Sequence, residues 1–177
     1  MLRLRPYKKC DAKKIIAWCK DEDTHHKWGG DHFGHFPITE NIMNEKYFNH
    51  NGDCNEEDNF YPMTAFDENG VVGHFIMRYL NGDNRTLRFG WVIIDDSKRG
   101  MCYGKEMLSL GLKYAFEIMN VSKVTIGVFA NNISAYYCYK KAGFQEIEMQ
   151  EEEFDMVHGE KWNIIELEIT EEDYYKK

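Results

Sequence analysis

The sequence predicts an α/β (α+β) fold in which helices flank a mixed, mostly antiparallel central sheet. Two turn signals, Glu68-Asn69-Gly70 and Asn81-Gly82-Asp83, separate three apolar segments, as expected of antiparallel strands joined by tight turns. Apolar residues then follow a helical period over Gly104–Asn120, and Lys123–Phe129 returns as an apolar strand. Three consecutive strands, a helix and a further strand therefore define the predicted fold.

Each expected element has its own local signal. Apolar or alternating segments predict strands over Leu2–Arg5, Pro62–Phe66, Val71–Leu80, Thr86–Ile94, Lys123–Phe129 and Trp162–Ile169. Asp11 is placed to cap a helix that carries Ile15, Ile16, Trp18 and Cys19. Thr39 is placed to cap a second helix that runs through Phe48. No linker, repeat or low-complexity run interrupts the chain, so residues 1–177 are expected to form a single domain.

Composition narrows the classes of function. The chain has 22 basic and 30 acidic residues and a net charge of −8, which disfavours nucleic-acid binding and favours cationic partners. No apolar run approaches the roughly 20 residues that span a bilayer, and the first residues lack a signal-peptide core. We therefore expect no membrane partner and a cytoplasmic location. The five cysteines show no Cys-x-x-Cys spacing, which indicates neither a disulfide framework nor a zinc site.

The segment from Val92 to Lys105 has the pattern of a buried strand, a glycine-punctuated turn and a helix start. Such a turn leaves several backbone N–H groups without partners inside the helix, and the helix dipole adds partial positive charge where these groups converge. Arg99 and Lys105 add side-chain cations. The segment therefore predicts a site for a ligand with two linked phosphates.

A second motif follows in Asn132–Phe144, a capped helix that closes at Gly143. Together the two motifs resemble those of the GNAT N-acetyltransferase superfamily, Arg/Gln-x-x-Gly-x-Gly/Ala and Asn-x-x-Ala-x-x-x-Tyr-x-Lys-x-Gly-Phe. The residues that match the two patterns are Arg99, Cys102 and Gly104, then Asn132, Ala135, Tyr139, Lys141, Gly143 and Phe144. The resemblance covers about Val71 to Phe144 and implies the GNAT fold.

The resemblance also implies a role for each matched residue. The strand edge at Val92, Ile93 and Ile94 would pair with the amides of the pantetheine arm, as it would with a neighbouring strand. Arg99 and the backbone N–H groups of the loop would hold the pyrophosphate of acetyl-CoA; the loop comprises Gly100, Met101, Cys102, Tyr103, Gly104 and Lys105. Asn132 and Lys141 complete the cofactor-binding set, and the Tyr139 hydroxyl would protonate the leaving thiolate.

The reaction that the resemblance implies is direct attack of a primary amine on acetyl-CoA in a ternary complex, without a metal. Two positions depart from the family pattern. Cys102 stands where the family prefers glycine, and its β-carbon would crowd a close approach of the backbone to phosphate. Arg88 and Gly127 stand where several family members have a glutamate that relays the amine proton. These departures support an alternative, an acyl-CoA-binding sensor of the same fold without turnover.

A histidine-rich segment allows three interpretations. It places His25, His26, His32 and His35 with Asp31, among the residues Trp28, Gly29, Gly30, Phe33, Gly34 and Phe36. The segment can be a loop after the first helix that shapes the acceptor pocket and supplies a histidine as proton relay, or a partly buried connector. A metal site, and with it a metal-dependent hydrolase, is the third interpretation, although the spacing matches no standard ligand pattern.

Two features within and just after the second motif, an acidic run and a set of helix residues, also allow more than one interpretation. An acidic run comprises Glu146, Glu148, Glu151, Glu152, Glu153 and Asp155. It is either a solvated hairpin tip or, as in GNAT folds, a border of the acceptor groove that attracts an amine. On the helix, Tyr136 and Tyr137 are expected to pack or to flank the cofactor, and Cys138 is expected in the core.

The sequence leaves the acceptor open. The aromatic N-terminal half, with Trp18, Trp28 and the histidine segment, resembles the ribosomal-protein N-terminal acetyltransferase branch. A peptide N-terminus, a polyamine, an aminoglycoside or another small amine fits these features. The protein can be a monomer or a homodimer.

Overall fold

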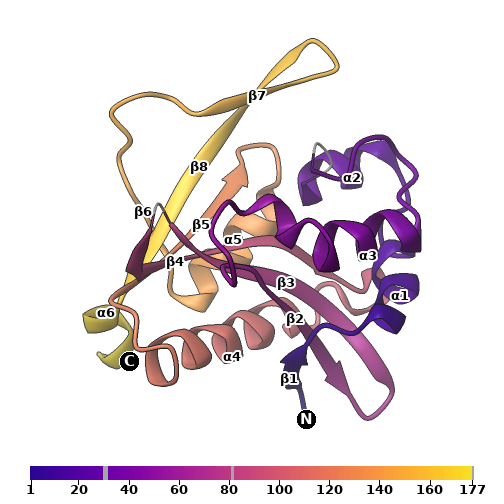
Figure 1. Cartoon of the computed structure of the whole chain (residues 1–177). Coiled ribbons are helices and arrows are strands. Elements are labelled where there is room, and N and C mark those ends of the chain that lie inside the picture. The colour runs from indigo at the N-terminus through magenta and orange to yellow at the C-terminus, as the bar shows by residue number, and fades with distance from the viewer. Residues whose placement is uncertain (30–31, 81, 177) are drawn as a thin grey trace.

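One open sheet organises the chain in the computed structural model, which describes residues 1–29, 32–80 and 82–176. Within these ranges, the strand order is β1-β2-β3-β4-β5-β8-β6, and β7 also pairs with β8 (Figure 1). The strands are β1 (Arg3–Pro6), β2 (Tyr61–Asp67), β3 (Gly70–Leu80), β4 (Asp83–Ile94), β5 (Lys123–Phe129), β6 (Gln145–Glu146), β7 (Phe154–Val157) and β8 (Glu160–Thr170). All neighbouring pairs are antiparallel except β4 and β5, which confirms the predicted mixed, mostly antiparallel sheet.

Helices cover both faces of the sheet (Figure 1). They are α1 (Ala12–Ile16), α2 (Glu22–Trp28), α3 (Glu40–Phe48), α4 (Tyr103–Glu117), α5 (Ile133–Ala142) and α6 (Glu171–Tyr175). The alternation of β3 shows the two faces. Phe75 and Met77 belong to the core that contains α4 and α5, whereas Ile76 belongs to the core that contains α1, α2 and α3. No helix in the described ranges is long and apolar enough to cross a membrane.

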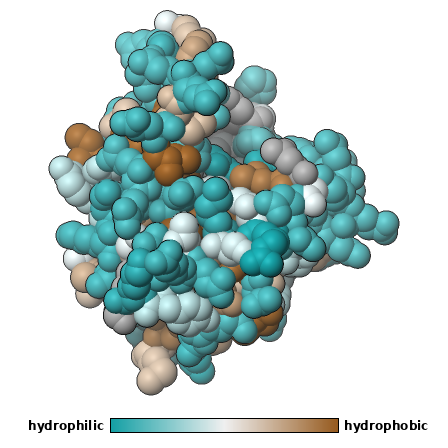
Figure 2. All heavy atoms as spheres, turned by 90° about the vertical axis from the view of Figure 1, so that its left-hand side faces the viewer, coloured by the Kyte–Doolittle hydropathy of each residue, from teal (hydrophilic) through white to brown (hydrophobic). Residues whose placement is uncertain are grey.

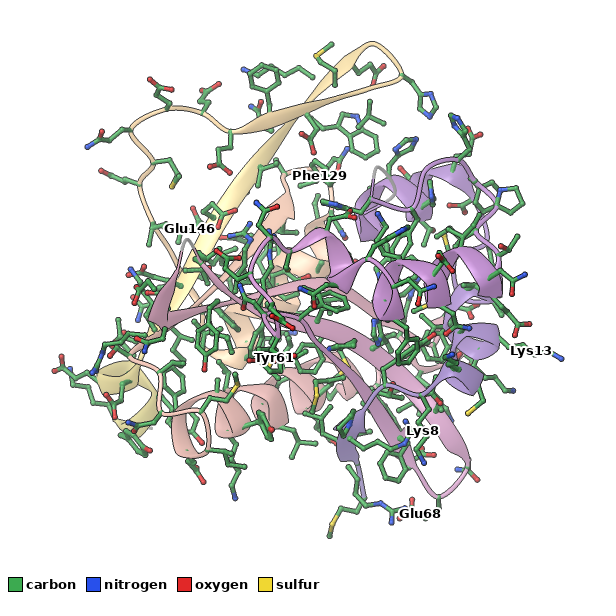
Figure 3. All side chains as sticks on the ribbon, in the orientation of Figure 1. Lys8, Lys13, Tyr61, Glu68, Phe129 and Glu146 are labelled. Atoms are coloured by element: carbon green, nitrogen blue, oxygen red, sulfur yellow. The ribbon has the colours of Figure 1, made fainter. Side chains whose placement is uncertain are left out.

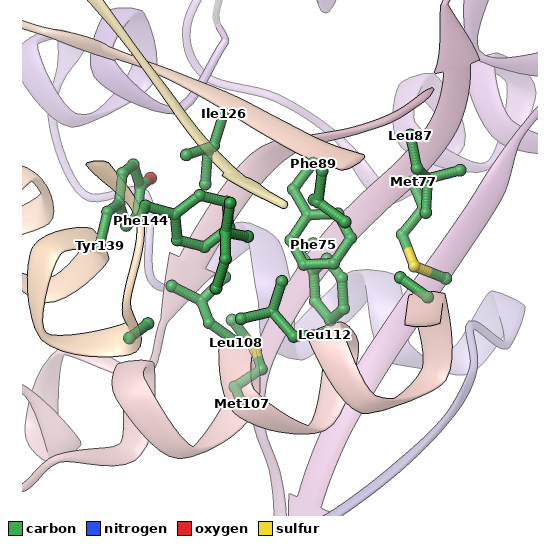
Figure 4. Packing of buried hydrophobic residues seen from close by; sticks show 14 of the residues in the cluster. Phe75, Met77, Leu87, Phe89, Met107, Leu108, Leu112, Ile126, Tyr139 and Phe144 are labelled. Atoms are coloured by element: carbon green, nitrogen blue, oxygen red, sulfur yellow. The ribbon is translucent and has the colours of Figure 1, made fainter. Parts of the chain in front are cut away.

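The apolar stripe of α4 anchors the larger core. Its buried residues are Met107, Leu108, Gly111, Leu112, Ala115 and Phe116, which repeat at helical spacing. Gly111 is the point of closest approach, because a β-carbon there would lie 2.7 Å from a ring carbon of Phe75. Figure 4 shows how Leu108 and Leu112 pack beneath the rings of Phe75 and Phe89. The face that Figure 2 presents, the left-hand side of Figure 1, is mainly hydrophilic, with small separate apolar patches.

The first helix differs from the prediction. Asp11 makes no side-chain cap of α1; it is buried, and its carboxylate accepts hydrogen bonds from two nitrogens of Arg5, at 2.7 and 2.8 Å, and from Thr64. Burial alone would raise the pKa of Asp11, but the bonds from Arg5, the Lys8 backbone and Thr64 outweigh it and lower the pKa. Asp11 therefore fastens the chain after β1 to β2. Helix α1 ends at Ile16, before Trp18 and Cys19.

Other elements follow the prediction or were not anticipated. The Thr39 hydroxyl accepts a hydrogen bond from the Ile42 N–H and caps α3, as predicted. Helix α2, capped by Asp21, was missed because its 7 residues are mostly polar and carry no apolar stripe. The short strands β6 and β7 and the helix α6 were missed as well. Gly30, Asp31 and Asn81, which were assigned to the histidine segment and a turn, lie outside the described residues.

Candidate active site

The strands β4 and β5 separate where the candidate site lies. They pair in parallel only from Thr86 opposite Lys123 to Phe89 opposite Ile126. Beyond that point β4 continues to Ile94 and β5 continues to Phe129 without pairing with each other. The edge of β4 after Phe89 is thus available to another extended group, as the resemblance requires for the pantetheine arm.

A bulge in β4 sits at this separation. The pairing with β3 shifts between His74 and Ile76, and Trp91 has a φ of +48°. Two neighbours hold this strained residue. The indole Nε1 of Trp28 donates a hydrogen bond to the Trp91 carbonyl oxygen at 2.8 Å, and Gly29 leaves room for the Trp91 ring, since a β-carbon there would lie 2.8 Å from it. Helix α2 therefore fixes the bent strand.

Two adjoining cavities open at the bulge. The first, of about 540 Å³, is lined by β4 and by the loop before α4; we call it the glycine-loop pocket. The second, of about 370 Å³, is lined by residues such as Arg78, Arg88, Gly127 and Asp155; we call it the arginine pocket. Both cavities are lined by Lys27, Trp28, Val92, Asn132 and Tyr139. These five residues form the junction through which a ligand in one pocket can meet a ligand in the other.

The structure brings nearly all of the predicted cofactor residues into one cavity. The glycine-loop pocket is lined by Val92, Ile93, Ile94, Arg99, Gly100, Cys102, Tyr103, Gly104, Lys105, Asn132 and Lys141. Met101 does not line it and is 57 % exposed. Cys102 precedes α4 with a φ of +65°, the left-handed region that favours glycine, so the glycine of the family pattern suits this backbone.

The charge of the glycine-loop pocket suits a polyanion. Among the described residues that line it, the cations are Lys27, Lys98, Arg99, Lys105 and Lys141, and the acid is Asp23. The first turn of the 15-residue helix α4 points its free N–H groups toward the same loop. Cations and backbone donors together can hold linked phosphates, and the apolar strand edge of β4 can hold an extended amide chain.

Tyr139 lies at the junction of the two pockets. Its ring is 6 % exposed and packs near Phe144, with ring centres 6.4 Å apart, and Figure 4 shows its hydroxyl at the margin of the core. Burial, and next the neighbouring Cys138, raise the pKa of Tyr139, so the hydroxyl keeps its proton at neutral pH. No hydrogen bond occupies this hydroxyl within the described part of the chain. It is therefore a buried donor available to a ligand.

The neighbours of Tyr139 on and before α5 have different roles: one caps the helix, and others line the glycine-loop pocket. The Asn132 side chain accepts a hydrogen bond from the Ala135 N–H and caps the helix. Tyr136 donates to Glu146, and Tyr137 is 57 % exposed and lines the glycine-loop pocket. Cys138 was expected in the core, but it is half-buried and lines that pocket too. Its sulfur faces α4, because a β-carbon on Gly104 would lie 2.8 Å from it.

The arginine pocket contains an ion pair that the sequence did not reveal. Arg88 donates from two nitrogens to the two carboxylate oxygens of Glu166, at 2.7 and 2.6 Å. Gly127 pairs with Glu166 across β5 and β8, and a β-carbon on Gly127 would lie 2.5 Å from one of these oxygens. Arg88 and Gly127, the positions of the family base, therefore adjoin a buried carboxylate that is already neutralised. The available signal was the pair of acidic residues, Glu166 and Glu168, within the otherwise largely apolar strand Trp162–Ile169.

The histidine segment forms one wall of the arginine pocket. His26 and His32 line it, His25 is buried, and His35 is exposed. The first part of the segment belongs to α2, so the expected loop is partly helical. Burial lowers the pKa of His32, with Arg78 and Lys46 acting in the same direction and Asp53 opposing them. Nowhere in the described ranges do three or more His, Cys, Asp or Glu residues converge as a metal site would require.

The acidic run lies partly at the pocket. Asp155 lines the arginine pocket from β7, whereas Glu152 pairs with Lys161 at 2.9 Å and Glu146 accepts from Tyr136. The β7–β8 hairpin reaches past Phe129 toward α2 (Figure 3), and the His158 ring at its tip lies 4.8 Å from that of His26. Part of the run is therefore a solvated connection, and Asp155 borders the pocket.

Comparison with known proteins identifies the family. The model of the acetyltransferase (GNAT) domain matches residues 1–145. The chain belongs to the GNAT acetyltransferase family. Its activity is thus the acetyl-CoA-dependent transfer of an acetyl group to an amine, and the cations that line the glycine-loop pocket suit the phosphates of this cosubstrate. An uncommitted buried hydroxyl between the pockets, that of Tyr139, agrees with this chemistry.

Two named GNAT relatives act on polyamines. The chain is 24 % identical to a spermidine N(1)-acetyltransferase of Vibrio cholerae over 133 residues, 75 % of each chain. It is 30 % identical to a spermine/spermidine N(1)-acetyltransferase of Bacillus subtilis over 100 residues, 52 % of this chain and 64 % of the relative. A crystal structure of the Vibrio cholerae enzyme with CoA and spermine has a TM-score of 0.79 at 22 % identity, covering 98 % of both chains, which shows the shared fold. These relatives do not single out the ribosomal-protein branch.

Proposed function

We propose that acetyl-CoA occupies the glycine-loop pocket, that the acceptor amine occupies the arginine pocket, and that Tyr139 assists the departure of the sulfur between them. One observation carries the proposal: Asn132 and Tyr139 line both pockets. They stand seven residues apart on α5, two turns along the same face. A thioester carbonyl at this junction would lie within reach of an amine from the second pocket.

The chemistry follows from the groups present. The amine nitrogen attacks the thioester carbonyl carbon, the tetrahedral intermediate collapses, and the carbon–sulfur bond breaks to release CoA thiolate. The Tyr139 hydroxyl can donate a hydrogen bond to that sulfur as negative charge develops on it. Because its pKa is raised above that of an ordinary thiol, about 8.5, the phenol stabilises the thiolate chiefly as a donor rather than by complete ionisation.

The acceptor must lose a proton without a free carboxylate at the family position. Both oxygens of Glu166 are taken by Arg88, and Gly127 has no side chain. We propose that water in the arginine pocket carries the amine proton away, which favours acceptors that reach the pocket as the free amine. The rate should then rise with pH as the fraction of neutral acceptor grows.

The acceptor is a small primary amine in this proposal. Spermidine and spermine, the acceptors in the names of the relatives, are the reference compounds. A peptide N-terminus, which the ribosomal-protein branch implies, is the second class to test. In support of it, the aromatic residue Trp28 lines both pockets and Trp91 lines the arginine pocket, so both could flank a bound peptide.

Two measurements test the proposed function. Release of free thiol from acetyl-CoA is followed with polyamines, small amines and peptides, and the acetylated product is identified by mass spectrometry. In parallel, acetyl-CoA should stabilise the fold by about 2.7 kcal/mol at a hundredfold excess over its Kd, with much smaller effects of NADH and ATP. Stabilisation without turnover on any amine would favour the sensor alternative. Equal shifts with all three ligands would contradict the cofactor assignment.

A further inference from the structure

Two arginines on neighbouring strands face each other in the arginine pocket, the proposed acceptor site. Arg78 on β3 is directly opposite Arg88 on β4 in the antiparallel register, and both line the arginine pocket. Arg88 is neutralised by Glu166 through two hydrogen bonds. Arg78 has no carboxylate at ion-pair distance among the residues that the structure describes. Like charges directly opposite on neighbouring strands are unfavourable, so an uncompensated guanidinium here costs stability.

The surroundings of Arg78 do not remove its charge. Its guanidinium lies beside the Cys54 thiol, which it can reach by hydrogen bond, and near the His32 ring. The Asp53 carboxylate lies 3.7 Å from Nδ1 of His32, but it is held by Lys46 at 2.6 Å. In a partly enclosed cavity, a charge acts on a ligand more strongly than it would in bulk water. Arg78 is therefore suited to hold an anionic group.

A carboxylate stands elsewhere on the wall of the same pocket. Asp155 is the one acid among the described residues that line the arginine pocket, and no ion pair engages it in those ranges. The lining also contains Lys27, which pairs with Asp23 at 2.8 Å. Once the paired charges are set aside, one guanidinium and one carboxylate are left. This set complements a ligand that carries one cationic and one anionic group.

We infer that the acceptor is a small zwitterionic amine, whose carboxylate or phosphonate-like anion is held by Arg78. The inference rests on the proposed function and narrows its acceptor class. Asp155 attracts the ammonium form toward the pocket, water there takes the proton to give the free amine that attacks, and Arg78 orients the molecule by its other end. A polyamine would instead bring several ammonium groups and no anion, so it would leave Arg78 without a partner of opposite charge.

A matched amine series tests the inference on the unaltered protein. β-Alanine, γ-aminobutyrate and aminoethylphosphonate are compared with ethylamine, propylamine and butylamine, and with spermidine and spermine, by thiol release at saturating acetyl-CoA. The expected result is a kcat/KM about tenfold to a hundredfold higher for the amines with an anionic group than for the matched alkylamines that lack it, the effect of one charge-assisted hydrogen bond. A preference for polyamines, or equal rates within matched pairs, would overturn the inference and leave the proposed function intact.

Variants of Arg78 give the second arm. Arg78→Gln should raise KM for the preferred anionic amine by about tenfold to a hundredfold, with kcat little changed and the matched amine unaffected. Arg78→Lys should recover part of the affinity. Arg85→Gln, which removes an exposed arginine that hydrogen-bonds Ser122 outside both pockets, is the matched control. If Arg78→Gln lowers rates on all amines equally, its role is structural and the inference is wrong. If the unaltered protein acetylates no amine in any series, the proposed function fails together with the inference.

Discussion

Arg88 and Glu166 form a two-pronged ion pair across the strand that carries Gly127, with nitrogen–oxygen distances of 2.7 and 2.6 Å. Glu166 is 5 % exposed, so loss of its partner would leave a buried carboxylate without compensation. We expect Arg88→Gln to lower the free energy of unfolding by roughly 3 kcal/mol. Replacing both residues, as Arg88→Met with Glu166→Leu, should recover most of that loss. Urea unfolding measures the free energy of unfolding of the single and the double variant. A decrease of less than about 1 kcal/mol in Arg88→Gln would show that the ion pair is solvated.

Removal of the Tyr139 hydroxyl should affect chemistry and spare binding. We expect Tyr139→Phe to lower kcat by about 10²-fold to 10⁴-fold, because the leaving sulfur loses its hydrogen-bond donor. The Kd for acetyl-CoA should change little, since the ring stays packed near Phe144. Tyr137→Phe, on the same helix and lining only the glycine-loop pocket, is the matched control. Full activity of Tyr139→Phe would assign the tyrosine to packing alone.

Cys102 should report occupancy of the glycine-loop pocket. It is exposed and lines the pocket, so an alkylating reagent should modify it faster than Cys19, which is buried. Burial, with a smaller contribution from Asp21, raises the pKa of Cys19 to about 11 and further slows its reaction. Acetyl-CoA should protect Cys102 and leave Cys10 unaffected, because Cys10 is exposed outside both pockets. Mass-mapped time courses measure these rates. Unchanged labelling of Cys102 with acetyl-CoA present would place the cofactor elsewhere.

Acid should destabilise the fold through His74. This ring is fully buried, and Tyr47 lies within 2.7 Å of its Nε2. Burial lowers the pKa of His74 to about 3, although the Met63 backbone and Asp11 act in the opposite direction. An unfolded histidine titrates near 6.5, so the stability contributed by neutral His74 is present above about pH 6.5 and is lost as the pH falls toward about 3.

The measurement is the free energy of unfolding at several pH values. The slope due to this one group cannot exceed about 1.4 kcal/mol per pH unit. His74→Gln should remove its share of the slope, whereas Tyr47→Phe should keep it because the ring stays buried. If the slope of His74→Gln matches that of the unaltered protein between about pH 6.5 and 4, His74 is not the source of the acid sensitivity in that range.

Local signals in the sequence were sufficient for the larger part of the fold. Strand β5 was predicted over Lys123–Phe129 and α3 was predicted with its Thr39 cap, because apolar period and capping act over a few residues. Asp11 was misassigned because its side chain is taken by Arg5 and Thr64, and the latter is 53 residues away. A competition between a local cap and a distant partner cannot be resolved from the spacing of residues in one chain.

In the candidate site, too, features set by local sequence were predictable and features set by distant contacts were not. Most of the lining of the glycine-loop pocket was predictable, because it comes from two contiguous motifs; the part contributed by α2, such as Lys27 and Trp28, was not. The bulge at Trp91 and the Arg88–Glu166 pair were not, since each depends on how distant strands align. Likewise, nothing local indicates that Arg78 is opposite Arg88. The arginine pocket, whose lining comes from distant elements such as α2, β3, β4 and β7, is thus harder to predict than the glycine-loop pocket.

The residues shared by the two pockets also constrain the order of events. Trp28, Val92 and Tyr139 line both pockets, so under the proposed assignment the acetyl end of the donor would form part of the surface that the acceptor meets. An acceptor that binds before acetyl-CoA would meet an incomplete binding surface and would bind weakly. The proposed assignment of the two pockets therefore predicts ordered addition, with the donor binding first and CoA leaving last. Free CoA would accordingly compete with acetyl-CoA. The amine could still bind beside CoA, but more weakly, because the acetyl group that completes its surface is missing.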